Sequence, residues 1–250
     1  MAEIVQLAEE RVESFANDST AIHAVAPVVS VVRQHLHEKE YLSLLDVGGG
    51  NGTFLDTMLQ AIPDSTGTLV EMSHGMADKN APSTRKTVVC ANFLDWASAA
   101  AQIQQRFDVI FFNFVLHHFV GKRRAESNRL QIQALQAAKS VLAKDGLIVV
   151  YEIHYNGLLH DELPSTLIHT LSSSALLSPV VKRLGANTAG YGVCFHSENY
   201  WKKLFGGNGL SVVNEHLIVH GSFRGVNARV KQILLNISTM DYKIHFVRSA

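Results

Sequence analysis

The sequence has few cysteines and no long hydrophobic run. Its 250 residues include only Cys90 and Cys194, which stand in apolar surroundings without metal-ligand spacing. This pattern excludes a disulfide framework and favours a reducing compartment, the cytoplasm. No stretch is apolar for long enough to span a membrane, and the N-terminus does not resemble a signal peptide.

An excess of charge of either sign is also lacking. Lys and Arg number 22, and so do Asp and Glu. Because phosphate binding normally needs a basic excess, this balance argues against nucleic acid as a partner. The 13 histidines show no H-x-x-x-H pair on a predicted helix and no zinc spacing with cysteine, so no metal site is predicted.

Apolar runs alternate with helical patterns through most of the chain. With 47% hydrophobic residues, the chain can bury the core of one large domain. Strands that alternate with helices and read as continuous apolar runs predict an α/β fold with a mostly parallel sheet. We expect an N-terminal helical cap over residues 1–40 and a core over 41–250, with a substrate-cap insertion at about 154–193. Strands are predicted near 42–47, 66–72, 87–90, 107–113, 146–153, 210–219 and 242–248.

A glycine-rich turn, Asp46-Val47-Gly48-Gly49-Gly50-Asn51-Gly52, follows the first predicted strand. Such a turn lets a backbone approach a ligand closely. The dinucleotide fingerprint G-x-G-x-x-G is incomplete here, because Thr53 occupies the position of its third glycine. The carboxylate of Asp46 would repel a pyrophosphate, whereas it suits a ligand that carries an ammonium and a sulfonium.

The motif Asp46-x-Gly48-x-Gly50-x-Gly52 resembles the glycine motif of class I S-adenosylmethionine-dependent methyltransferases, in the form found in small-molecule O-methyltransferases. The resemblance implies a Rossmann-like, doubly wound seven-stranded sheet with helices on both faces and the last strand antiparallel. It also implies a set of residues that bind S-adenosyl-L-methionine: Asp46, Gly48, Gly49, Gly50, Gly52, Glu71, Met72, Asn92, Phe93 and Asn113.

Three of these residues have specific expected roles. Glu71 ends the second strand, where a carboxylate can accept both ribose hydroxyl protons. Asn92 follows the third strand and could hydrogen-bond the adenine amino group, although asparagine is also a common turn residue. Asn113 ends the fourth strand without the prolines typical of nucleobase-amine methyltransferases, which favours a small-molecule acceptor.

The acceptor must lose a proton, which calls for a general base. The candidates are His117, His118 and His154, which follow the fourth and fifth predicted strands. Tyr155, Tyr191 and His196 are expected to bind the substrate. The resemblance implies a hydroxyl as the acceptor group, and the apolar insertion suits an aromatic, polyketide-like or other apolar metabolite. N- or C-methylation, a cyclisation without methyl transfer, and a monomeric or homodimeric state remain alternatives.

Overall fold

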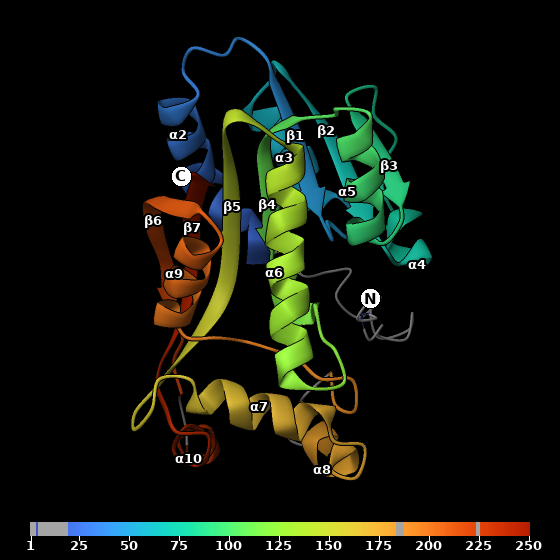
Figure 1. Ribbon diagram of the computed structural model, residues 1–250. Helices are drawn as coiled ribbons and strands as arrows, with labels where there is room; N and C mark the ends of the chain where they lie inside the picture. The colour runs from blue at the N-terminus through green and yellow to red at the C-terminus, as the bar shows by residue number, and fades with distance from the viewer. Residues whose placement is uncertain (1–3, 5–19, 184–187, 224–225) are drawn as a thin grey trace.

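A single seven-stranded sheet organises the chain (Figure 1). The computed structural model describes residue 4 and residues 20–183, 188–223 and 226–250. The strand order is β3-β2-β1-β4-β5-β7-β6, in which β1 to β5 pair in parallel and β7 runs antiparallel to both neighbours. This confirms the predicted fold class. The strands are β1 (Leu42–Val47), β2 (Ser65–Glu71), β3 (Lys86–Cys90), β4 (Phe107–Asn113), β5 (Leu142–Gly157), β6 (Leu210–His220) and β7 (Ile237–Ser249).

Helices cover both faces of the sheet, because successive residues of each central strand point to opposite sides. Leu45 and Ile110 pack against helices on one face, and Leu44 and Val109 pack against those on the other. The first face carries α5 (Phe93–Gln102), α6 (Arg124–Val141) and α9 (Glu198–Gly207). The second carries the short helix η2 (Thr20–Ala24), α2 (Val25–His35) and α3 (Thr53–Ala61).

The carboxyl ends of the parallel strands meet at the edge of the sheet where a helical cap lies. In Figure 1, α7, α8 and α10 lie beyond this end, across from the loop that joins α2 to β1. The remaining elements are α4 (His74–Ala77), η3 (Leu116–His118), α7 (Leu163–Ser173), α8 (Ser178–Arg183) and α10 (Val226–Leu234). The cap therefore lies over the carboxyl ends of the strands, where α/β folds bind ligands.

Strand β5 is longer than the sequence predicts. Strand β5 does not end at Ile153 but continues to Gly157, and its extension pairs with β7 as far as Gly157 opposite Ile237. The hydrogen bonds that extend it come from a strand some 80 residues away, so local patterning does not reveal them. Of the helical cap predicted for residues 1–40, residues 1–3 and 5–19 lie outside the described residues.

Candidate active site

One large cavity lies at the carboxyl edge of the sheet, beneath the cap. Its volume is about 900 Å³, which is near the upper end of the range for small-molecule sites. Residues predicted to bind the cofactor line one part of it: Asp46, Gly48, Gly49, Gly50, Glu71, Met72, Asn92, Phe93 and Asn113. Aromatic side chains line much of the remainder: Phe114, Phe119, Tyr155, Tyr191, Phe195, Phe223 and Tyr242.

The glycine turn follows β1 directly and presents its backbone to the cavity. Gly48 and Gly50 have φ of +65° and +57°, a region that favours glycine. A Cβ at Gly48 would lie 2.4 Å from Cγ2 of Val115, so a side chain cannot fit there. Gly52 is the N-cap of α3 and does not line the cavity. Its observed role is to start the helix, and its contact with the cofactor stays a prediction.

Asp46 is a buried carboxylate at the end of β1. Its Oδ1 accepts a long hydrogen bond, 3.5 Å, from Nδ2 of Asn113, and Oδ2 has no hydrogen-bond partner among the described residues. Burial raises the pKa of Asp46 to about 8; the charge of Glu71 adds to the rise, while Asn113 and Lys86 oppose it. A cationic group bound in the cavity would stabilise the ionised form of this carboxylate.

Glu71 holds the glycine turn against the end of β2. Its Oε2 accepts a hydrogen bond from the backbone N–H of Gly50 at 3.0 Å, and its Oε1 accepts one from that of Ser73 at 2.8 Å. Each carboxylate oxygen can accept a second hydrogen bond. Glu71 can therefore bind a pair of hydroxyl groups while it keeps the turn in place.

Asn92 lines the cavity and also caps the N-terminus of a helix. Its Oδ1 accepts a hydrogen bond from the backbone N–H of Leu94 at 2.9 Å, which caps α5. A contact with a bound adenine would therefore use its amide NH₂ group. The neighbouring Phe93 also lines the cavity, and its ring packs edge-on against Phe112 at 5.7 Å between centroids.

His117 forms a buried pair with Glu152 beside the aromatic part of the cavity. Nδ1 of His117 lies 2.7 Å from Oε2 of Glu152, and the backbone N–H of His117 donates to Oε1 at 3.3 Å. Because a carboxylate only accepts, Nδ1 carries the proton, and in that tautomer Nε2 has a lone pair. The ring of Phe195 stacks on that of His117 at 4.4 Å between centroids.

His118 lines the same cavity but has a different environment. Its ring lies 4.2 Å from that of His117. Burial lowers the pKa of His118 well below its usual range, and the neighbouring His117 lowers it further. A neutral ring with so low a pKa is a weak proton acceptor.

The structure does not place His154 in the cavity, contrary to its expected role. Because β5 continues through this position, Ile153 and Tyr155 face the cavity and His154 points to the opposite side. There it is fully buried and stacks on His245 at 4.9 Å between centroids. Burial lowers the pKa of both rings to about 3, so both are neutral.

Of the three residues predicted to bind the substrate, two line the cavity and one does not. Tyr155 and Tyr191 line the cavity, whereas His196 does not. His196 is fully buried because its backbone pairs with His154 beside β5, and its ring stacks on Tyr200 at 3.8 Å. Burial raises the pKa of Tyr155 to about 12, so its hydroxyl remains a neutral hydrogen-bond group.

Sequence reasoning missed Glu152 and Gln131, the two polar residues that contact the segments around His117. Glu152 is only 1% exposed in an apolar strand, and Gln131 is fully buried in α6. An acidic residue inside a run of buried apolar residues is a signal that could have singled out Glu152, since such groups are buried only with partners. Nothing in the local pattern of α6 distinguishes Gln131.

Two absences concern the described residues alone. No group of three or more His, Cys, Asp or Glu among them could hold a metal ion. Nor does any helix in the described ranges have the length and apolar character needed to cross a membrane.

The segment that carries the glycine turn is similar to a known protein family. Residues 45–148 match the family model of a methyltransferase domain. This range begins next to Asp46 and ends within β5, so it includes the glycine turn, Glu71, Asn92 and Asn113. No curated protein matches the chain.

Several solved structures similar to this one are described as methyltransferases. Mitomycin 7-O-methyltransferase is 16% identical with a TM-score of 0.53, covering 96% of this chain and 60% of its own. An O-methyltransferase family protein from Burkholderia thailandensis is 18% identical with a TM-score of 0.55, and the match covers 96% of this chain and 59% of that protein. Plantazolicin methyltransferase in complex with SAH is 12% identical with a TM-score of 0.59, and the match covers 96% of this chain and 90% of that protein.

The chain spans about 60% of the length of the first two of these proteins. At these identities the similarity establishes the fold. The family match adds that residues 45–148, less than half of the chain, are similar to a methyltransferase domain.

Proposed function

We propose that this chain transfers a methyl group from S-adenosylmethionine to a hydroxyl group of an apolar, aromatic small molecule. The observation that carries this proposal is the single cavity shared by the cofactor residues, by His117 and by a wall of aromatic side chains. Its volume of about 900 Å³ gives room for a cofactor and an acceptor together.

The residues of the glycine-turn end suit the cofactor. The buried Asp46 carboxylate has an oxygen without a partner among the described residues, which suits the cationic methionine part. Glu71 suits the ribose diol, and the glycines at 48 and 50 leave the backbone open. When bound, S-adenosylmethionine supplies an activated methyl group on a sulfonium, so the protein's contribution is orientation, exclusion of water and removal of a proton.

His117 is suited to remove the acceptor's proton. Its Nδ1–H donates to Glu152, which leaves Nε2 to accept a proton from an acceptor hydroxyl. The buried carboxylate of Glu152 stabilises the imidazolium that results. A base placed in this way typically contributes about 100- to 10,000-fold to the rate.

The other walls of the cavity favour an aromatic acceptor. Phe114, Tyr155 and Phe195 line the cavity near His117, while Ile168 and Leu171 of α7 line it from the cap. Flat apolar surfaces of this kind pack well against fused rings. Tyr155, whose phenol stays protonated, offers a hydrogen bond for orientation.

A pair of matched compounds tests the proposal. We expect 2-hydroxyanthraquinone to yield a methyl ether with S-adenosylmethionine, detected by chromatography and mass spectrometry, and 2-aminoanthraquinone to yield no product. The His117→Gln variant should bind the cofactor normally and lose most of this activity. Methylation of the amine alone would contradict O-methylation, and full activity of His117→Gln would contradict the assignment of the base.

A further inference from the structure

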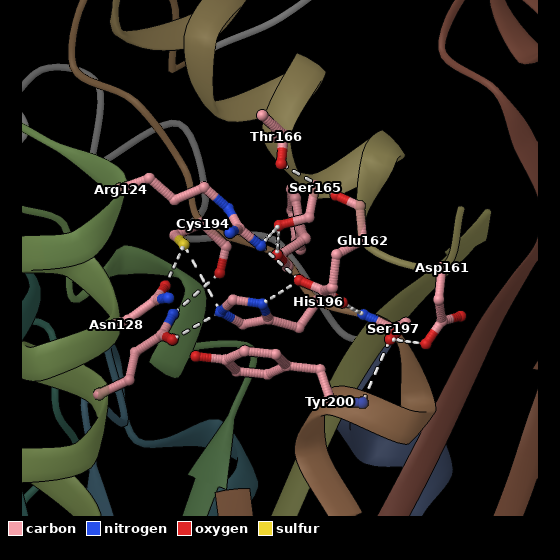
Figure 2. A network of polar contacts seen from close by, with 12 residues as sticks. Arg124, Asn128, Asp161, Glu162, Ser165, Thr166, Cys194, His196, Ser197 and Tyr200 are labelled. Carbon is pink, nitrogen blue, oxygen red and sulfur yellow. Dashed lines mark hydrogen bonds and ion pairs between the residues drawn. The ribbon is translucent and has the colours of Figure 1, made fainter. Parts of the chain in front are cut away.

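A buried polar network joins α6, the cap helix α7 and the segment before α9 (Figure 2). His196 is at its centre: Nδ1 lies 2.8 Å from Oε2 of Glu162, and Nε2 lies 2.9 Å from Oε1 of Gln131. Arg124 forms an ion pair with Glu162. We name Arg124, Gln131, Glu162 and His196 the polar clasp.

The amide of Gln131 has only one orientation that satisfies its neighbours. Its Nε2 donates to the carbonyl oxygen of Cys194 at 2.8 Å and to that of Leu116 at 3.1 Å. Because both of these are acceptors, the NH₂ group is fixed there, and Oε1 faces Nε2 of His196 at 2.9 Å, from which it accepts a hydrogen bond when Nε2 carries the proton. The two carbonyl oxygens and His196 together determine how Gln131 presents its two donors.

Those two donors hold the residues that precede each ring of the stacked pair. Leu116 precedes His117, and Cys194 precedes Phe195. The backbone N–H of Cys194 also donates to the carbonyl oxygen of His117 at 2.9 Å. Gln131 thus joins the two segments whose side chains, His117 and Phe195, stack at an interplanar angle of 29°.

We propose that Gln131 is a positioning residue for His117, and that His196 and Glu162 hold its amide in the productive orientation. The proposal rests on the proposed role of His117 as base. Gln131, Glu162 and His196 do not line the cavity, so they act through the segments that they join and not through contact with the acceptor. The clasp keeps the ring of Phe195 stacked on one face of the His117 ring, while the carboxylate of Glu152 contacts Nδ1 at the edge of that ring.

The test uses the nitrogen signals of ¹⁵N-histidine-labelled protein, which report the tautomer of each ring. The His117→Gln variant identifies the His117 signals by their loss. In the unaltered protein we expect the Nδ1–H tautomer for His117. In Gln131→Glu, a carboxylate faces the carbonyls of Leu116 and Cys194, which repels both segments. We expect its His117 signals to move toward the average of the two tautomers.

Two further variants make the result decisive if Gln131→Glu does not fold. Gln131→Met removes both donors without adding charge, and Phe195→Leu removes the stacked ring without altering the clasp. Both should change the His117 signals in the same direction. Gln136→Glu is the matched control, since it makes the same change on α6 at an exposed residue bonded to Asn208. It should leave the signals as they are.

The affinity for S-adenosylhomocysteine, measured by calorimetry on the same variants, should stay within about twofold of the original. His117 signals that remain unchanged in Gln131→Met and Phe195→Leu would overturn the proposal. This failure is distinguishable from failure of the proposed function, because the signals are read without an acceptor and the activity of His117→Gln tests the base separately.

Discussion

Nδ1 of His117 lies 2.7 Å from Oε2 of Glu152, within hydrogen-bond distance, although the two residues are 35 positions apart in the chain. His117 belongs to η3, after β4, and Glu152 lies within β5. Parallel pairing of β4 with β5 brings Asn113 opposite Tyr151, which places the two segments side by side. The fold thus provides an oriented imidazole next to the aromatic part of the cavity.

Replacing Glu152 tests the role of this pair. Glu152→Gln preserves the shape of the side chain but removes the charge that stabilises the imidazolium. We expect methyl transfer to 2-hydroxyanthraquinone to fall about 100-fold, with little change in affinity for S-adenosylhomocysteine. The control is Glu38→Gln, at a side chain that is 90% exposed. Equal rates for both variants would show that Glu152 does not support the base.

Asp46 should lower the stability of the protein without ligand. Its folded-state pKa of about 8 lies above the ordinary value of 3.8, so ionisation costs more in the folded chain than in the unfolded one. This penalty is absent below pH 3.8, grows as the pH rises from there to about 8, and stays constant above that. We therefore expect Asp46→Asn to raise the melting temperature, and to raise it more at alkaline than at acidic pH.

Thermal melts across this pH range measure the effect, and calorimetry measures its cost. The same variant should bind S-adenosylmethionine at least about tenfold more weakly, because it lacks the charge that faces the cationic ligand. A variant that is less stable at alkaline pH than the original protein would contradict this account of Asp46.

Binding of S-adenosylmethionine should release protons at neutral pH. Below about pH 8 much of Asp46 is protonated in the free protein. A bound cation lowers its pKa, so the proton leaves and affinity rises with pH toward about 8. Titrations in buffers of different ionisation enthalpy measure the number of protons released. Asp46→Asn should abolish the release, and proton uptake by the original protein would contradict the prediction.

The glycine turn should tolerate no side chain at Gly50, for a reason of backbone strain. With φ at +57°, alanine at this position costs roughly 1–2 kcal/mol. A Cβ there would also lie 3.1 Å from the terminal carbon of Met76, in the wall of the cavity. We expect Gly50→Ala to weaken cofactor binding at least about tenfold. Gly206→Ala, with nothing within 4 Å, should bind normally.

The sequence predicts the sheet well because its signals are local. The apolar runs of the central strands and the turn after Val47 are visible in short windows, and their order defines the fold. The extension of β5 to Gly157 was not predictable in this way, since its partner Ile237 is distant in the chain. That extension also explains why the side chain of His154 lies on the face of β5 away from the cavity.

The candidate site follows the same division. The residues that line its cofactor end, such as Asp46, Glu71 and Asn113, stand at strand ends, where position in the chain determines position in space. Glu152 and Gln131 matter because of what tertiary packing brings beside them. Their partners lie far along the chain, so no spacing rule could name them.

Titration calorimetry with S-adenosylhomocysteine tests the central claim most directly. The account predicts one binding site per chain, with affinity that falls at least about tenfold in Glu71→Ala because the ribose hydroxyls lose their acceptor. An absence of binding at about 1 mM ligand, or equal affinity in Glu71→Ala and the original protein, would contradict it.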